Sequence, residues 1–260
     1  MPNPEPSPKR SRVSGIDRTI QILDYLSEVG APTSAYDIAK SVGAPISTIY
    51  AIVDDLVARN LLSRPSPKMV WLGARLLRYG LAYEAGLNLL AEAKREMEML
   101  SRKLGETVQI CVRDEGFMVV AAMAYGDGHF RVTSDVGTRV PLNWTASGRL
   151  LVGHLSTEDR QAIFAEFAKP SPTEKAETDP VKLAQWAGDD FDRKLAVQFG
   201  ASDFAVSCIA SPIRDSDGTC VATISIVAAE PKAKEKFQIY SAEVRDSAAT
   251  IERSVGRIAA

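Results

Sequence analysis

Residues 43–62, GAPISTIYAIVDDLVARNLL, contain the pattern that decides the fold of the N-terminal part of the chain. Pro45 suits the start of a helix, where its missing N–H leaves no hydrogen bond unmade. Apolar side chains then recur at i, i+3, i+4 and i+7, which gives a helix one buried stripe: Ile49, Ile52, Val53 and Leu56. The opposite face of this helix is predicted to be exposed to solvent.

The segments on either side of this helix complete an order of elements. Ser14 and Asp17 are spaced as in a capping box, and apolar side chains follow at helical spacing within residues 15–29: Ile16, Ile20, Leu23 and Leu26. Ser34 and Gly43 bracket a short second helix. Downstream, LLSRPSPKMVWLG reads as two short strands around a Pro/Ser turn. This order is that of a winged helix-turn-helix, whose longer helix enters a DNA groove.

Beyond Leu87 the pattern changes. A helix ending near Gly105 is followed by short β-rich runs, TVQICVR, FMVVAAMAY and FRVTS, with DEG and GDG turns between them. FAVSCIASPIR and CVATISIVAA are predicted to be two strands of a hairpin joined by DSDG. Helices are expected from about Ser147 and over three further segments, residues 157–168, 181–199 and 235–258. Helices on an antiparallel sheet make this part of the chain an α+β domain.

Composition and charge narrow the class of protein. The 260 residues are 45% hydrophobic and 25% charged, as in a soluble globular protein, and no apolar run is long enough to span a membrane. The net charge of −2 is uneven, with +3 up to Gly80 and −5 in the rest, which favours an anionic partner at the N-terminal end. MPNPEPSPKRSR lacks the apolar core of a secretory signal, and three scattered cysteines suit a reducing cytoplasm.

The sequence gives no support to an enzyme. Ser147 lacks the G-x-S-x-G setting of a nucleophile, and His154 lies two helical turns further on. The chain has two histidines and no cysteine cluster, so a catalytic zinc site is not expected. No glycine-rich phosphate loop or dinucleotide fingerprint is present. We therefore expect neither a metal nor another cofactor.

Four motifs, in order along residues 14–258, resemble the IclR family of bacterial transcriptional regulators. They are SAYDIAKSVGAPISTIY with LVARNLLSR, then WLGARLLRYG, VPLNWTASGRLLVGHL and CIASPIRDSDGTCVATISI. The resemblance implies a homodimer or a pair of dimers on a palindromic operator, and a small effector that is often an organic acid. It also implies a winged helix-turn-helix (14–72), a linker helix (73–87) and a GAF-like effector-binding domain (88–260). The Pro, Ser and basic residues of the segment before them (1–13) predict a disordered basic arm.

The expected DNA contacts combine the helix faces with this resemblance. The first turn of the longer helix offers hydroxyls and free backbone N–H groups suited to phosphate. The family commonly has a basic residue at the position of Ala51, and here Asp54 and Asp55 follow instead, so we expect repulsion or simple solvation at these carboxylates and modest affinity. The residues predicted to contact DNA are Arg18, Ser47, Thr48, Tyr50, Arg64 and Lys68.

The expected effector site is also read from the resemblance. A helix that starts near Ser147 presents unpaired N–H groups and partial positive charge, which can hold a carboxylate. Bulky Trp144 and apolar Val227 stand where the family often has small and hydroxyl residues, which indicates a less polar pocket, although Trp144 can equally be core packing outside it. The residues predicted to bind the effector are His129, Val132, Trp144, Ala146, Ser147, Asp203, Cys208, Ser225 and Val227.

The sequence thus predicts a cytoplasmic, ligand-responsive transcriptional regulator and favours a repressor that binds double-stranded DNA and a small molecule. The alternative is a metabolite sensor of the same fold with weak or partner-dependent DNA binding, for which Ala51, Asp54 and Asp55 are the motivation. An enzyme acting on a small molecule ranks third.

Overall fold

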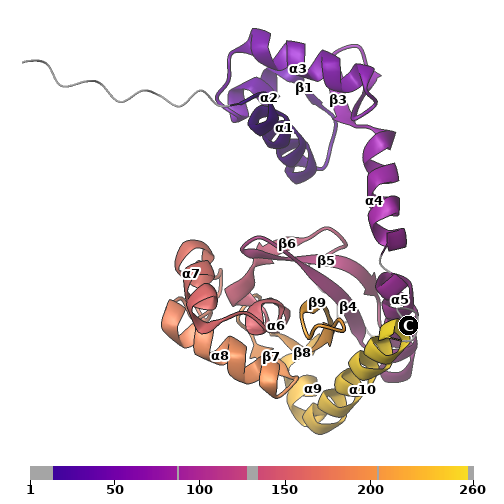
Figure 1. Cartoon of the computed structure of the whole chain (residues 1–260), viewed down its shortest axis with the longest axis vertical. Coiled ribbons are helices and arrows are strands. Elements are labelled where there is room, and N and C mark those ends of the chain that lie inside the picture. Colours follow the sequence, from indigo (N-terminus) through magenta and orange to yellow (C-terminus); the bar gives the residue numbers. More distant parts are fainter. Residues whose placement is uncertain (1–13, 87, 128–133, 204, 257–260) are drawn as a thin grey trace, which may run out of the picture. The chain divides into compact units, whose positions relative to one another are not determined.

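The computed structural model describes residues 14–86, 88–127, 134–203 and 205–256. The chain divides into two compact units, Met1–Gly86 and Leu87–Ala260. Figure 1 labels the helices and strands of both units. Within the described ranges, no helix combines the length and the apolar character needed to cross a membrane.

The first unit is a helical bundle with a small sheet (Figure 1). Its three short strands have the order β1-β3-β2, and β2 with β3 forms a hairpin that we call the wing. Its core joins all three of the first helices to the sheet and includes Ile38, Ile49, Val53, Leu62 and Val70. The elements are α1 (Gly15–Val29), β1 (Thr33–Ser34), α2 (Ala35–Ser41), α3 (Ile46–Ala58), β2 (Leu62–Ser66), β3 (Met69–Leu72) and α4 (Ala74–Gly86).

Helix α1 begins at the predicted cap but buries a different face from the one expected. The Ser14 hydroxyl accepts from the Asp17 N–H at 3.1 Å, and the Asp17 carboxylate accepts from the Ser14 N–H at 3.0 Å, which forms a capping box. The predicted stripe was wrong at its first two positions, because Ile16 and Ile20 are 73% and 52% exposed. Arg18, one turn before buried Ile22, lies on the inner side of α1 instead, because its guanidinium donates to the Val42 carbonyl at the end of α2.

The second unit is built around a six-stranded antiparallel sheet of order β6-β5-β4-β9-β8-β7. Helices α6 to α8 cover one side of this sheet, and α5 and α10 cover the other (Figure 1). The elements are α5 (Asn88–Leu104), β4 (Thr107–Asp114), β5 (Phe117–Ala124), β6 (Arg139–Pro141), the 3-10 turn η1 (Leu142–Trp144), α6 (Ala146–Gly153), α7 (Thr157–Phe167), α8 (Pro180–Asp192), β7 (Ala196–Phe199), β8 (Val206–Arg214), β9 (Cys220–Ala229), α9 (Glu230–Glu235) and α10 (Phe237–Gly256).

Strand alternation gives this sheet two different faces. On the central strand β9, Ile224 and Ile226 point toward α5 and α10 and join the larger apolar core. The intervening Ser225 and Val227 point to the α6 side, where β9 pairs with β4 and β8. The α6 side is therefore richer in polar groups than the other, and it is the side on which the sequence placed the effector site.

One part of the secondary-structure prediction was wrong. Residues 181–199 were expected to be one helix, but α8 ends at Asp192, and Ala196–Phe199 forms the edge strand β7 paired with β8. The break follows from Lys194, whose φ of +53° lies in the left-handed region and cannot continue a helix. The expected C-terminal helix of residues 235–258 is confirmed as α10, which the short helix α9 precedes. Most of the expected strand FRVTS lies outside the described residues.

Candidate effector pocket and DNA-facing helix

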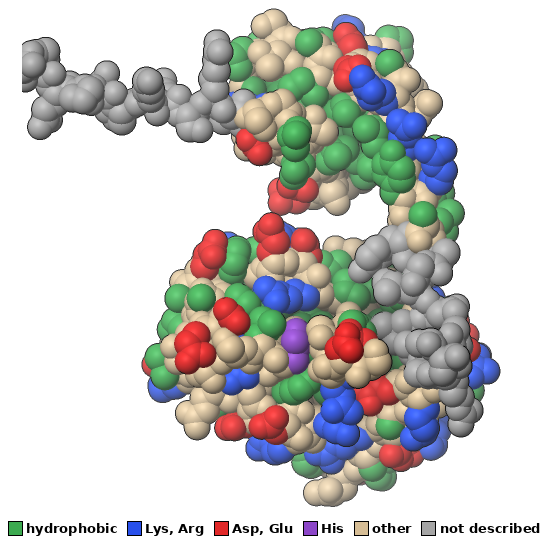
Figure 2. All heavy atoms as spheres, in the orientation of Figure 1, with side chains coloured by type: hydrophobic (Ala, Val, Ile, Leu, Met, Phe, Trp, Pro, Cys, Tyr) green, Lys and Arg blue, Asp and Glu red, His purple; other side chains and the backbone are tan. Residues whose placement is uncertain are grey.

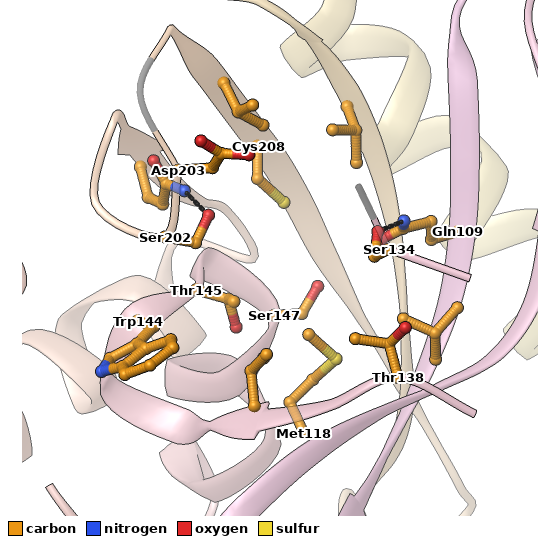
Figure 3. A pocket seen from close by; sticks show the side chains of 15 residues that line it. Gln109, Met118, Ser134, Thr138, Trp144, Thr145, Ser147, Ser202, Asp203 and Cys208 are labelled. Carbon is orange, nitrogen blue, oxygen red and sulfur yellow. Dashed lines mark hydrogen bonds between the residues drawn. The ribbon is translucent and has the colours of Figure 1, made fainter. Parts of the chain in front are cut away.

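A cavity of about 240 Å³ lies on the α6 side of the sheet in the second unit (Figure 3). Its walls come from the sheet, from the turn between η1 and α6, and from the connection between β7 and β8. The lining residues are Gln109, Met118, Val120, Ser134, Thr138, Val140, Trp144, Thr145, Ser147, Gln198, Ser202, Asp203, Val206, Cys208 and Val227.

The N-terminus of α6 forms one wall of this cavity. Thr145 is the N-cap, and its hydroxyl accepts from the Gly148 N–H at 2.9 Å. Ser147 follows in the first turn with 1% of its surface exposed, and its hydroxyl is buried without a hydrogen-bond partner in the described structure. Figure 3 shows Ser147 directed into the cavity. A buried hydroxyl in the first turn of a helix can serve an anionic or polar ligand, because that turn carries partial positive charge.

A cluster of buried thiols and hydroxyls lies beside the Ser147 hydroxyl. Burial raises the pKa of the Cys111 thiol to about 12 and also raises the pKa of Cys208. The hydroxyls of Ser147 and Ser225 lie near both sulfurs and partly offset these rises, although neither hydroxyl has a hydrogen bond of good geometry. Both thiols therefore stay protonated at neutral pH and are not nucleophiles. Of the two, Cys208 lines the cavity.

Two glutamines hold polar groups at the sides of the cavity. The Gln109 amide on β4 donates to the Ser134 hydroxyl at 2.9 Å, and the Gln198 amide on β7 donates to the Ser202 hydroxyl at 2.8 Å (Figure 3). The Gln198 carbonyl also accepts from the Ala201 N–H at 3.1 Å, which fixes the connection that leads to Asp203. The carboxylate of Asp203 thus lies on the cavity wall, where it can accept a hydrogen bond from a ligand.

The rest of the cavity surface is largely apolar. Met118, Val120 and Val227 line it from the sheet. Trp144 also lines it, and its indole N–H donates to the Lys169 carbonyl at 2.9 Å, so its ring is held in place. Since the polar groups gather at the α6 turn and near Asp203, the cavity suits a small ligand with an apolar body and polar ends.

The structure places the predicted effector residues in three groups. Trp144, Ser147, Asp203, Cys208 and Val227 line the cavity. Ala146 and Ser225 are fully buried and are not among the lining residues. His129 and Val132 lie outside the described residues.

Sequence reasoning missed most of the other lining residues, above all the two glutamines. Each is a polar residue inside an apolar strand, TVQIC for Gln109 and LAVQF for Gln198, and that interruption was an available signal. Gln198 was lost for a further reason: its segment was expected to be helical, so the face on which it lies could not be read.

In the first unit, the exposed side of α3 carries the residues expected at the DNA. Ser47 and Thr48 are exposed in the first turn, and Tyr50 is 45% exposed one position after buried Ile49. The N-cap is Pro45, which makes no side-chain capping bond, so the first turn of α3 keeps N–H groups that can meet a phosphate.

The basic residues near α3 differ in what they contact. The Arg18 guanidinium donates to the Val42 carbonyl at 2.6 Å and to Gln21 at 2.9 Å, so part of its hydrogen-bonding capacity is used within the fold. Arg64 on the wing forms an ion pair with Asp54 on α3. Lys68 is exposed at the turn between β2 and β3.

A metal site has no basis in the described part of the chain. Neither unit contains there a group of three or more His, Cys, Asp or Glu side chains that could hold a metal ion.

Comparison with known proteins identifies both units. Residues 15–66 match the model of the IclR helix-turn-helix domain, and residues 81–253 match that of the bacterial transcriptional regulator IclR C-terminal domain. The HTH-type transcriptional repressor AllR of Escherichia coli is 27% identical over 243 residues, which cover 93% of this chain and 90% of AllR.

Solved structures of similar proteins agree with this assignment. An IclR homolog of Microbacterium hydrocarbonoxydans, complexed with 4-hydroxybenzoate, matches with a TM-score of 0.80 and 25% identity over 94% of this chain and all of the other. An IclR transcriptional regulator of Alicyclobacillus acidocaldarius matches with a TM-score of 0.79 and 18% identity over 93% of this chain and 98% of the other. The expected winged helix, α+β effector domain and regulatory function are thereby confirmed, and the chain belongs to the IclR family of bacterial transcriptional regulators, which bind DNA and respond to small molecules and are not enzymes.

Proposed function

We propose that this regulator is a repressor whose effector is a small organic acid, with an aromatic or short aliphatic body, bound in the cavity beside α6. The observation that carries the proposal is the buried, unpartnered Ser147 hydroxyl in the first turn of α6, directed into the cavity. AllR, a repressor, supports the direction of regulation, and the 4-hydroxybenzoate complex of the Microbacterium homolog supports an aromatic acid.

The chemistry of the cavity suggests how such an acid would be oriented. Its carboxylate would lie at the α6 turn, where the hydroxyl of Ser147 and the partial charge of the helix favour an anion. Its apolar body would contact Met118 and Val227. A hydroxyl or other donor at the far end would face Asp203, which would also disfavour a second carboxylate there. Ala146 and Ser225, which are buried and outside the lining, would support this wall from behind.

The DNA-binding part of the proposal concerns residues 14–72. Two copies would bind the half-sites of a palindromic operator as a homodimer or a dimer of dimers, with Ser47, Thr48 and Tyr50 at the groove and Lys68 at the backbone. The linker helix of residues 73–87 would carry the response of the effector domain (88–260) to the DNA-binding domain, since half-site spacing is sensitive to small shifts. The basic arm of residues 1–13 would add phosphate contacts, and the whole regulator would work in the cytoplasm.

The test is a fluorescence-anisotropy titration of the full-length protein against duplex DNA from upstream of its own gene. A scrambled duplex of the same length is titrated beside it, at two salt concentrations. We expect tighter binding to the upstream duplex, and release of that duplex when 4-hydroxybenzoate or another small acid is added. Equal binding to both duplexes would contradict the operator proposal, and binding that no acid alters would contradict the effector proposal.

Two variants connect this assay to the proposed residues. Ser147→Ala removes the hydroxyl from the α6 turn and is expected to weaken the response to the acid, whereas DNA affinity without effector stays unchanged. Lys68→Ala is expected to weaken the binding of both duplexes by the same factor. It is also expected to reduce the dependence of this affinity on salt concentration by an amount that corresponds to about one phosphate contact. An unchanged response in Ser147→Ala would place the carboxylate elsewhere.

A second candidate is the sensor with weak or partner-dependent DNA binding. One observation favours it: Arg64 and Arg59, two of the cations close to α3, already form ion pairs with Asp54 and Asp55. Weak binding, equal for both duplexes and lost at the higher salt concentration, would support this alternative over a repressor that reads its operator alone.

A further inference from the structure

The acidic pair in the DNA-facing helix is neutralised within the winged-helix unit. The Asp54 carboxylate accepts from an Arg64 Nη atom at 2.5 Å, and Arg64 comes from the wing, ten positions further along the chain. Asp55 pairs instead with Arg59 on its own helix at 3.0 Å, in an i, i+4 pair. Figure 2 shows acidic and basic side chains side by side on this unit, where α3 leads into the wing.

The position of Asp54 distinguishes it from Asp55. The buried stripe of α3 is Ile49, Val53 and Leu56. Asp54 lies four and seven positions after Tyr50 and Ser47, so these three exposed residues share one face of the helix. Asp55 is rotated away from that face by about 100°. The Asp54–Arg64 pair therefore lies on the helix face of Ser47 and Tyr50, whereas Asp55 follows Thr48 by seven positions and lies on the neighbouring face.

A carboxylate and a phosphate bind an arginine in the same way. The guanidinium presents a planar fork of donors that either group can accept from. Asp54 is 65% exposed and the Arg64 side chain is 28% exposed, so water screens the pair and its net strength is small. A DNA phosphate that reaches the wing can thus displace Asp54 from Arg64, but it must replace a contact that already exists.

We propose that Asp54 sets the DNA affinity of this regulator by holding Arg64 in the free protein and competing with the DNA phosphate for its guanidinium. The inference rests on the DNA binding of the winged helix and adds a residue that weakens it. Since the contested group is a phosphate, the effect is independent of base sequence. Asp54 is thus expected to lower affinity for operator and scrambled DNA by the same factor.

The first test is Asp54→Asn in the full-length protein, with Asp55→Asn as the matched control one position along the same helix. Both variants remove one negative charge at an exposed site. Asp54→Asn is expected to tighten binding of any duplex by about fivefold, or about 1 kcal/mol, the upper value for a surface pair. Asp55→Asn is expected to change duplex affinity by less than twofold, because its partner Arg59 belongs to the C-cap of α3 and not to the wing.

The second test is the double-mutant cycle with Arg64→Ala. If Asp54 competes for Arg64, the gain from Asp54→Asn shrinks when Arg64 is absent. If Asp54 acts only through its own repulsion of DNA, the gain is equal or larger without Arg64, because the carboxylate is then unshielded. An equal or larger gain without Arg64 would overturn the proposal. Weaker DNA binding by the single variant Asp54→Asn would also overturn it, because Asp54 would then position Arg64 for DNA.

The failure of this proposal can be told apart from that of the operator proposal. The cycle is measured on a scrambled duplex at low salt, where phosphate contacts suffice for binding. Operator selectivity is measured separately, as the ratio of the two duplex affinities, and is expected to be unchanged in Asp54→Asn. A changed ratio would show that Asp54 contacts a base, and no binding of either duplex by any variant would overturn both proposals.

Discussion

Replacing Gly148 by alanine is expected to damage both the stability and the pocket of the effector domain. A Cβ on Gly148 would lie 2.1 Å from the Leu142 carbonyl oxygen and 2.6 Å from the Leu142 Cα, both of them backbone atoms of η1. Overpacking of this kind costs up to about 3 kcal/mol, and alanine regains about 1 kcal/mol of helix propensity. The expected net loss is about 2 kcal/mol, or roughly 4–8 °C in the unfolding temperature of this domain.

The functional consequence follows from the same contact. Because the Cβ forces the first turn of α6 away from η1, Ser147 moves relative to the cavity, and we expect effector affinity to fall by about tenfold. Calorimetric unfolding of the full-length protein, with and without effector, measures both effects. Gly80→Ala is the matched control, since Gly80 lies within α4 with no atom inside 4 Å of the added Cβ, and is expected to stabilise by up to about 1 kcal/mol. Equal unfolding temperatures for Gly148→Ala and the unmodified protein would refute this reasoning.

Three further predictions concern stability. Burial raises the pKa of the Cys111 and Cys220 thiols to about 12, so these thiols ionise at a lower pH in the unfolded chain than in the folded protein. The free energy of unfolding is therefore unaffected by them below pH 9. Between pH 9 and 12 it falls by about 1.4 kcal/mol per pH unit for each thiol. Urea unfolding at pH 8 and pH 10 measures this fall, which must be smaller in the matching Cys→Ala variants. Asp190→Ala removes the only carboxylate that pairs with the largely buried Arg149 guanidinium among the described residues, and leaves it the Val197 carbonyl. This variant is expected to cost about 3–5 kcal/mol, whereas Arg149→Met combined with Asp190→Leu costs far less. Equal losses of the two variants in urea unfolding would contradict this expectation. Ser14→Ala removes the capping box of α1 and is expected to cost about 1 kcal/mol, seen as faster amide hydrogen exchange in that helix but not elsewhere.

The local pattern of the chain was a good guide to its elements and a poorer guide to their faces. The spacing of Ile49, Val53 and Leu56 identified α3 and its buried side, because helix periodicity is a local property. The same reasoning failed at Ile16 and Ile20, since the packing of α1 depends on where Arg18 finds a carbonyl to cap. That partner, Val42, is 24 positions away and belongs to another helix.

In the candidate effector site, too, the sequence located some residues and only the fold brought in others. The turn before α6, with Ser147, could be located from its motif, and Asp203, Cys208 and Val227 were named from the resemblance and lie on the cavity wall. Gln109 and Gln198 could not be assigned to it, because they lie on β4 and β7, which flank opposite ends of the β9–β8 pair. Only the curl of the sheet under α6 brings both amides to one cavity.

The sequence by itself determined most of the elements, with their caps and turns, and the family, because these depend on side-chain spacing over a few residues. Only the tertiary structure decided which groups meet across the fold. It joined Arg64 to Asp54, set the Leu142 backbone against Gly148, and buried the Ser147 hydroxyl without a partner. The physical reason is that such contacts depend on packing and on competition for hydrogen bonds among distant segments, which no local period encodes.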